Sequence, residues 1–273
     1  VRRMRLVATE ACRRAANGAE FMQRIQRETG LKLDIIKPEE EAQLAVISCA
    51  PLVNRKTHNL LVVDIGGGST ELVWIDISKV PKADRAQSIM RLHGGFHQAK
   101  TDVPAARVVD WISVPLGVAT LRDQFSDVED DAARFALMSW FFEENLTDFT
   151  PYQSIQSQDH FQIVGTSGTV TTVAASHLGL KRYDRTKVDG LRMTSAQIDK
   201  VIHSYLAMGP GGRRADPRIG LDRQALIMSG AAILQALMRC WPTDRLSVAD
   251  RGLREGLLYA QMSADGVLEE GLG

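Results

Sequence analysis

The stretch LLVVDIGGGSTELVWID, residues 60–76, constrains the fold more than any other part of the chain. Three consecutive glycines separate two apolar runs, and Asp64 and Glu71 flank them. The runs at 60–65 and 70–76 are rich in aliphatic and β-branched residues, which favour strands. The sequence therefore predicts a β-hairpin whose loop consists of glycines and whose strands carry a carboxylate on each side of that loop.

The loop at 66–70 differs from the common nucleotide-binding loops. A dinucleotide fingerprint needs G-x-G-x-x-G at the start of a helix, and a Walker A loop ends in Gly-Lys-Ser/Thr. Without side chains, the backbone N–H groups of a glycine loop can form an anion-binding concavity. The candidate phosphate-binding residues are Gly66, Gly67, Gly68, Ser69 and Thr70. An ordinary glycine hairpin is the alternative, although it would not require the two carboxylates.

A second glycine loop lies within VGTSGTVTT, at a predicted strand-to-helix junction. The N-terminus of a helix favours anions, and the hydroxyls of this loop are further donors. Its candidate phosphate-binding residues are Gly165, Thr166, Ser167, Gly168 and Thr169. A tight strand–helix connection is the alternative. Two such loops in one chain favour a cleft that binds phosphate from both sides.

Acidic residues supply the remaining chemistry. Glu39, Glu40 and Glu41 begin a predicted helix, where acids also interact favourably with the helix dipole. Phosphate hydrolysis requires a carboxylate that positions water, and Mg²⁺ prefers one or two carboxylates together with substrate oxygens. Asp64 and Glu71 are therefore the candidate metal-binding residues.

The rest of the chain reads as a mixed α/β fold. Capping residues and periodicity predict helices at 17–29 and 38–49, with a strand at 31–36 between them. The segment 79–107 has weak periodicity and is predicted to be a long surface excursion. Further helices are predicted within 133–146, 168–180, 194–209, 223–241 and 250–262, and further strands near 161–166 and 245–249.

Composition excludes several classes of protein. The chain has 273 residues, with 44% hydrophobic residues and 33 basic against 33 acidic side chains, so bulk charge indicates no nucleic-acid partner. No apolar run approaches the roughly 20 residues that span a membrane. The three separated cysteines indicate no disulfide framework or zinc site and favour a cytoplasmic location. An arginine cluster near the N-terminus is either a solvated face or a patch that attracts a polyanion; it comprises Arg2, Arg3, Arg5, Arg13 and Arg14.

Other residues receive structural interpretations. His93 and His97 are four residues apart, but Gly94 and Gly95 argue against a helix that would make them a zinc site. The four tryptophans are expected in the core; they are Trp74, Trp111, Trp140 and Trp241.

Four motifs in the right order and at suitable spacing resemble the exopolyphosphatase / guanosine pentaphosphate phosphohydrolase (Ppx/GppA) family. They are EEAQLAV at 40–46, DIGGGSTEL at 64–72, GTSGTVTTVAA at 165–175 and DRGLREGLLY at 250–259. The resemblance covers roughly residues 5–262. It implies the actin-like fold of acetate and sugar kinases, Hsp70 and actin, with two ribonuclease-H-like domains around a cleft. It also implies Mg²⁺-dependent removal of a terminal phosphate.

The resemblance also assigns roles to residues. Glu41 matches the family's catalytic glutamate, Arg13 an arginine that faces substrate phosphate, and residues 66–70 a phosphate loop. Asp64 and Glu71 match acidic positions associated with metal and water, and residues 165–169 match the nucleotide-contacting element of the related kinases. Gln43 departs from the family pattern, where an arginine is usual.

The family opens with a strand and an Asp-x-Gly-[Ser/Thr]-Asn loop, and nothing like it precedes Val1. The expectation is therefore a first ribonuclease-H-like domain that is truncated at its N-terminus and ends at residue 48, followed by a second domain at 49–273. We expect such a chain to bind phosphate weakly, to be a weakly active fragment, and to expose Phe21, Ile25 and Leu44.

The leading interpretation is an exopolyphosphatase that releases the terminal phosphate of inorganic polyphosphate. The alternatives are a guanosine pentaphosphate 5′-phosphohydrolase and a polyphosphate-binding protein without turnover; a kinase of the same fold ranks below these. We expect Mg²⁺ as cofactor and no nucleic-acid or membrane partner, and the sequence leaves a homodimer open.

Overall fold

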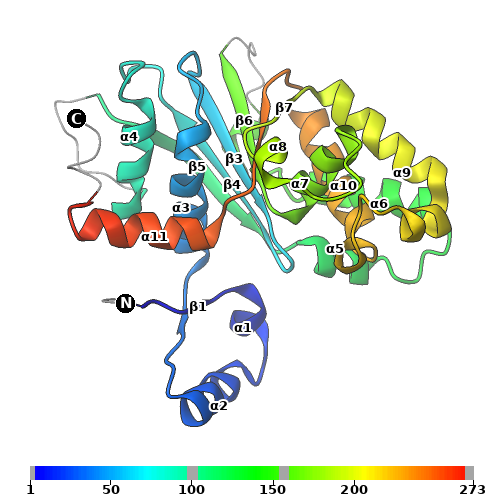
Figure 1. The fold of residues 1–273 in the computed structure, drawn as a ribbon, viewed down its shortest axis with the longest axis horizontal. Helices are drawn as coiled ribbons and strands as arrows, with labels where there is room; N and C mark the ends of the chain where they lie inside the picture. Colours follow the sequence, from blue (N-terminus) through cyan, green and yellow to red (C-terminus); the bar gives the residue numbers. More distant parts are fainter. Residues whose placement is uncertain (1–3, 97–103, 154–159, 268–273) are drawn as a thin grey trace.

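A six-stranded mixed sheet forms the centre of the molecule (Figure 1). The computed structural model describes residues 4–96, 104–153 and 160–267. Strand β3 (Asn59–Ile65) is antiparallel to β4 (Thr70–Asp76) and parallel to β6 (Phe161–Thr166). The complete order is β5 (Arg107–Val114), β4, β3, β6, β8 (Leu246–Ala249) and β7 (Arg192–Met193). Both predicted strands of the glycine hairpin are thus confirmed.

Helices cover both faces of this sheet (Figure 1). One face carries α3 (Pro38–Cys49) and α4 (Arg85–Met90), and α11 (Leu253–Ala264) packs on α3. The other face carries α7 (Gly168–His177), α9 (Ser195–Ala215) and α10 (Ile227–Cys240). Against α10 lie α5 (Val118–Gln124) and α6 (Asp131–Glu144), and the short α8 (Arg185–Val188) precedes β7.

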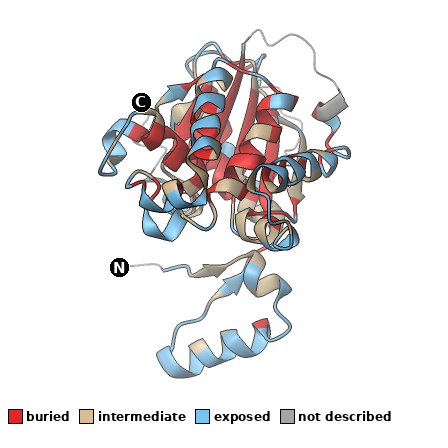
Figure 2. Ribbon diagram, turned by 90° about the vertical axis from the view of Figure 1, so that its right-hand side faces the viewer, coloured by how far each residue is buried: buried red, intermediate tan, exposed pale blue. Residues whose placement is uncertain are grey.

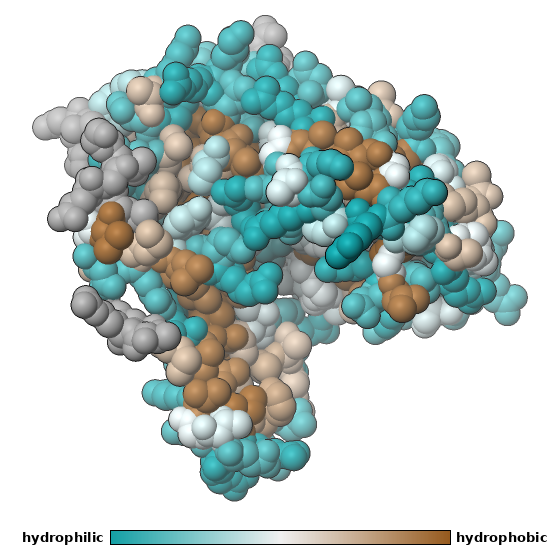
Figure 3. Space-filling model, viewed as in Figure 1, coloured by the Kyte–Doolittle hydropathy of each residue, from teal (hydrophilic) through white to brown (hydrophobic). Residues whose placement is uncertain are grey.

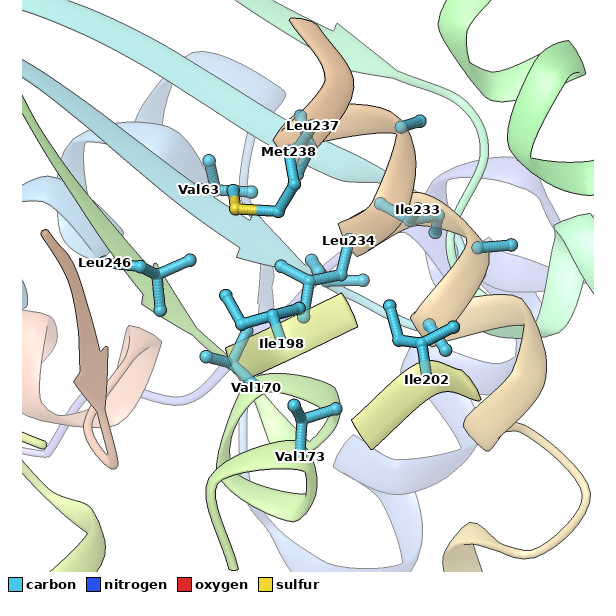
Figure 4. Packing of buried hydrophobic residues seen from close by; sticks show 14 of the residues in the cluster. Val63, Val170, Val173, Ile198, Ile202, Ile233, Leu234, Leu237, Met238 and Leu246 are labelled. Carbon is cyan, nitrogen blue, oxygen red and sulfur yellow. The ribbon is translucent and has the colours of Figure 1, made fainter. Parts of the chain in front are cut away.

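The alternation of side chains along β3 produces two separate cores. Leu61 and Val63 join the larger core on the side of α7, α9 and α10, which Figure 4 shows around Val63, Ile198 and Leu234. Leu60 and Val62 join the smaller core on the side of α3. Successive residues of a strand point to opposite faces, so a strand buried on both faces reads as a continuous apolar run.

An N-terminal segment, residues 4–36, stands apart from this sheet body (Figures 1 and 2). It contains β1 (Val7–Ala8), α1 (Glu10–Arg14), α2 (Gly18–Thr29) and β2 (Asp34–Ile35), with β1 and β2 paired in parallel. Gly30 ends α2 in the left-handed conformation. The predicted helix at 17–29 is confirmed, although the side chain of its N-cap residue Asn17 makes no capping hydrogen bond.

The packing of α3 differs from one expectation. Its residues Ala42, Val46 and Cys49 belong to the smaller core, so α3 packs on the sheet. Leu44 is 4% exposed because α11 covers it, so the expectation that it is exposed was wrong.

The exposure expected for apolar residues of α2 is confirmed for Phe21 and only in part for Ile25. Phe21 is 49% exposed on α2, and Ile25 on the same helix is partly buried. Apolar surface extends from the lower edge of the sheet body onto the N-terminal segment (Figure 3).

Two further expectations need correction. The segment 79–107 is not a simple surface excursion, since Ile89 of α4, Leu92 of the 3-10 turn η2 (Arg91–Gly94) and the following Phe96 are buried in the smaller core. Its residues 97–103, which include His97, lie outside the described part. Trp140 is 54% exposed and Trp241 is buried, so only part of the tryptophan set is core. Among the described residues, no helix is both long and apolar enough to cross a bilayer.

The contact between α11 and α3 allows a test of the fold. A Cβ at Gly256 would lie 2.2 Å from the carbonyl oxygen of Leu44, so any side chain there separates the two helices. We expect Gly256→Ala to lower the free energy of unfolding by about 1–3 kcal/mol, measured by urea denaturation. A Cβ at Gly211 meets no atom within 4 Å, so Gly211→Ala is the matched control and should not destabilise. Equal stability of the two variants would contradict this packing.

Candidate active site

The end of the β3–β4 hairpin gathers the candidate carboxylates. Asp64 and Glu71 are directly opposite in the antiparallel register, and Asp64 is also aligned with Thr166 of β6. Directly opposite residues of an antiparallel pair share a face, with their Cβ atoms about 4.5–5.5 Å apart. The two predicted metal-binding residues therefore lie side by side, one strand away from the second glycine loop.

Hydrogen bonds fix the first glycine loop through its carbonyl groups. The amide of Val118 donates to the oxygen of Gly66, and that of Ala119 donates to the oxygen of Gly67, both at 2.9 Å. The amides of Gly67 and Gly68 donate no hydrogen bond to another residue in the described part. The loop thus keeps free the N–H groups that the sequence analysis assigned to phosphate.

The glycines themselves serve different purposes. A Cβ at Gly68 would lie 2.7 Å from Cγ of Glu10, and a Cβ at Gly66 would lie 2.9 Å from the oxygen of Ser69, so both positions require close approach. Gly67 has no positive φ, and a Cβ there would meet no atom within 4 Å. Gly67 therefore borders open space, and no left-handed backbone requires a glycine there.

The two hydroxyls of this loop are engaged within the protein. Ser69 Oγ donates to Glu71 Oε1 at 2.7 Å, and Thr70 Oγ1 donates to the oxygen of Leu116 at 2.8 Å. Both residues are buried. In this structure neither hydroxyl is free to donate to a phosphate. Ser69 instead orients the carboxylate of Glu71, and Thr70 fixes the loop to Leu116.

Glu41 lies at the start of α3 and binds Arg13. Arg13 Nη2 is 2.9 Å from Glu41 Oε2 and 2.9 Å from Glu10 Oε2, and Arg13 Nη1 donates to the oxygen of Ile36. Burial raises the pKa of Glu41, and the arginine opposes this only in part. The structure thus brings together the two residues predicted as base and phosphate ligand, which are 28 residues apart in the sequence.

Glu41 also acts on the hairpin carboxylates. Burial raises the pKa of Asp64 to about 7 and that of Glu71 to about 8, and the negative charge of Glu41 adds to both shifts. Glu71 Oε1 accepts hydrogen bonds from Ser69 and Ser113, whereas its Oε2 is buried without a partner in the described part. This cluster has a surplus of negative charge that a proton or a cation would relieve.

Only some of the predicted residues of the second glycine loop face the open side of that loop. Ser167 has a φ of +110°, and its Oγ is buried without a partner among the described residues. Thr166 donates its hydroxyl to the oxygen of Arg251. Thr169 is buried beneath Gly230 and Gly165 lies within β6, so these two predicted residues face the core rather than the open side of the loop.

A cavity of about 540 Å³ joins this loop to Asp64. Thr166, Ser167 and Gly168 line it, together with Tyr183, Asp250 and apolar side chains. Four arginines that the sequence analysis did not identify also line it: Arg218, Arg223, Arg251 and Arg254. Two of them belong to the segment 250–259 that carried the resemblance, and the other two precede α10. Asp216 neutralises Arg218 and Asp189 neutralises Arg251.

Known proteins are similar to this chain over most of its length. Exopolyphosphatase 1 of Mycobacterium leprae is 24% identical over 265 residues, covering 94% of this chain and 68% of that protein. A guanosine-5′-triphosphate,3′-diphosphate pyrophosphatase of Aeromonas salmonicida is 26% identical over 261 residues, covering 94% of this chain and 44% of that protein. This chain thus spans less than half the length of the Aeromonas relative.

Solved structures are similar over a comparable range. The Aquifex aeolicus member of the Ppx/GppA family has a TM-score of 0.72 at 29% identity, over 97% of this chain and 76% of that one. An exopolyphosphatase from Cytophaga hutchinsonii, at 20% identity, has a TM-score of 0.75 over 95% of this chain and 75% of that one and shows the same fold. These likenesses support the actin-like fold expected from the resemblance. The model of the Ppx/GppA phosphatase family matches residues 1–265, and the protein therefore belongs to that family.

Proposed function

We propose that the protein is a phosphoanhydride hydrolase that releases the terminal phosphate of inorganic polyphosphate. The observation that carries this proposal is the position of Glu41. Its carboxylate is held by Arg13 and interacts electrostatically with Asp64 and Glu71, on the hairpin whose loop has free amide groups. A carboxylate beside an anion-binding loop is the arrangement that activates water for attack on a phosphoryl group.

Each residue of the site has a separate role in the proposed hydrolysis. Glu41 orients a water molecule and accepts its proton as the water oxygen bonds to the terminal phosphorus. The bridging P–O bond breaks, and the shortened chain leaves with its oxygen. The amides of Gly67 and Gly68 stabilise the charge on the phosphoryl oxygens. The raised pKa of Glu41 suits a general base, because proton affinity strengthens the base.

The cluster fits a divalent cation. Asp64 and Glu71 would hold Mg²⁺, since the buried Oε2 of Glu71 has no partner in the described part and Asp64 borders the cavity. No group of three or more His, Cys, Asp or Glu that could hold a metal occurs in the described ranges, so Mg²⁺ would need substrate and water oxygens to complete its shell. Bound there, Mg²⁺ would neutralise phosphate charge.

Guanosine pentaphosphate is the second candidate substrate. The Aeromonas relative carries a name that refers to this nucleotide, and polyphosphate and the 5′-triphosphate end in the same terminal phosphoanhydride. Phosphate release from polyphosphate and from the nucleotide, compared at equal concentration with Mg²⁺, separates the two. Tight binding without release of phosphate from either would instead favour the non-hydrolysing alternative.

Substitution of the base tests the mechanism. We expect Glu41→Gln to lower kcat for phosphate release by about 10²–10⁴-fold while changing the affinity for polyphosphate much less, because the amide cannot accept the proton. Glu39→Gln is the matched control, since Glu39 lies in the same first turn of α3 and contacts Gln43. An unchanged rate in Glu41→Gln would exclude Glu41 as the base.

The hairpin carboxylates predict a pH dependence of stability. The folded state binds protons more tightly than the unfolded chain, because the pKa values of Asp64 and Glu71 rise to about 7 and about 8. Their contribution to stability is therefore complete below about pH 4 and is lost as pH rises through these folded values.

The measurement is the free energy of unfolding between pH 5 and pH 8.5 without divalent cations. Asp64→Asn cannot titrate, so its stability should decline less than that of the wild type, by about 2–4 kcal/mol over this range. Asp123→Asn removes an exposed carboxylate and is the control. Parallel pH profiles for the wild type and Asp64→Asn would show that Asp64 is ionised throughout.

A further inference from the structure

Ser113 of β5 completes a row of residues across three strands. It lies directly opposite Glu71 of β4, which in turn lies opposite Asp64 of β3. Directly opposite residues of antiparallel strands point to the same face of the sheet. Ser113 therefore belongs to the carboxylate cluster, although none of the four motifs that carry the family resemblance includes it.

Two hydroxyl groups donate to one oxygen of Glu71. Ser113 Oγ lies 2.8 Å from Glu71 Oε1, and Ser69 Oγ lies 2.7 Å from the same atom. A carboxylate oxygen has two lone-pair positions, so these two hydrogen bonds use both of them. The two serines come from β5 and from the 66–70 loop, and together they hold the carboxylate in one orientation.

The other oxygen of Glu71 has no partner of its own. Oε2 is buried and accepts no hydrogen bond within the part of the chain that the structure describes. A buried polar atom without a partner costs free energy. If Glu71 had only a structural role, both of its oxygens would be expected to have partners. The difference between the two oxygens therefore indicates a ligand at Oε2.

This difference limits how Glu71 can bind a metal ion. Because both lone-pair positions of Oε1 are used, the carboxylate can offer Oε2 alone. Ca²⁺ takes roughly six to eight oxygen ligands and often binds both oxygens of one carboxylate. Mg²⁺ requires nearly octahedral geometry and uses few carboxylate oxygens together with water and substrate. A carboxylate that is restricted to one oxygen therefore favours Mg²⁺.

We propose that Ser113 is a positioning residue that determines the metal selectivity of the site. Together with Ser69 it occupies Oε1, so that Glu71 is a one-oxygen ligand and the site prefers Mg²⁺ to Ca²⁺. This inference rests on the proposed function, because it takes Asp64 and Glu71 as the metal-binding residues. It goes further by assigning the choice of metal to a strand residue outside both glycine loops.

The test compares the affinities of the full chain for the two metals without any phosphate present. Bound Mn²⁺ is measured by electron paramagnetic resonance, and Mg²⁺ or Ca²⁺ is added as the competitor. We expect Ser113→Ala to weaken Mg²⁺ binding by about 10-fold, because a hydrogen-bond partner of a metal ligand is lost. Ca²⁺ binding should weaken less, since Oε1 becomes available as a second ligand atom. The preference for Mg²⁺ should therefore fall by about 3–10-fold.

Three further variants distinguish positioning from a general effect on the fold. Ser113→Thr keeps the hydroxyl and suits a strand, so it should retain the preference for Mg²⁺. Ser69→Ala removes the other hydrogen bond to Oε1 and should shift the preference in the same direction as Ser113→Ala. Ser126→Ala is the control, because its exposed hydroxyl donates to the carbonyl oxygen of Asp123, and it should change neither affinity. Thermal unfolding without divalent cations checks that each variant folds.

The outcomes separate this inference from the proposed function. Equal losses of Mg²⁺ and Ca²⁺ affinity in Ser113→Ala, or no loss of either, would overturn the inference. A wild-type chain that binds no Mn²⁺ would overturn it together with the metal site at Asp64 and Glu71. Phosphate release from polyphosphate is measured separately on the wild type. A selectivity shift without phosphate release would refute the hydrolase and support the inference, whereas phosphate release with an unchanged preference would overturn the inference alone.

Discussion

Strand β3 is the element on which the rest of the structure depends, because it pairs with β4 on one side and with β6 on the other. This double pairing aligns Asp64 with Glu71 in one direction and with Thr166 in the other. The same strand separates the two cores by alternating its side chains. A shift of one residue in its register would turn Asp64 to the other face and separate it from Glu71. Because both faces of β3 are buried, its register is fixed, and with it the positions of Asp64 and Glu71.

Electrostatics then determines how the site behaves. Glu41, Asp64 and Glu71 are three carboxylates close enough to influence one another, and Arg13 forms an ion pair with Glu41 among them. Arg13 is itself shared with Glu10, so its single charge does not balance the cluster. Burial raises the pKa values of Asp64 and Glu71, and the negative charge of Glu41 raises them further. Under the proposed function, these carboxylates would bind a cation and the adjacent loop amides would bind phosphate, and phosphoryl transfer needs both kinds of ligand.

Much of this could be predicted from local sequence. The glycine hairpin, the start of α3 at Pro38 and the strand–loop–helix at β6 and α7 were predicted because each has a local signal of periodicity, capping or loop chemistry. The roles of Arg13 and Glu41 were assigned from the family resemblance, and the ion pair between them was not predicted. The internal use of Thr70 and the burial of Thr169 were missed, since each depends on a partner distant in sequence, Leu116 in one case and Gly230 in the other. Leu44 was misjudged for the same reason, because α11 comes from the far end of the chain.

The N-terminal segment contacts the sheet body at the start of α3 and at the 66–70 loop. Arg13 binds Glu41, Arg5 is 2.6 Å from Glu40, and Glu10 packs against Gly68. Apolar burial between this segment and the sheet body is limited to a small cluster around Ile36, and α2 has only Gly18 buried. Ion pairs near the 66–70 loop therefore contribute much of the contact between this segment and the sheet body, and such pairs are strengthened where water is excluded and weakened by salt. A phosphate that entered beside Arg13 would compete with Glu10 and Glu41 for the same guanidinium. Under the proposed function, phosphate binding at the 66–70 loop would therefore be coupled to the attachment of the N-terminal segment through Arg13.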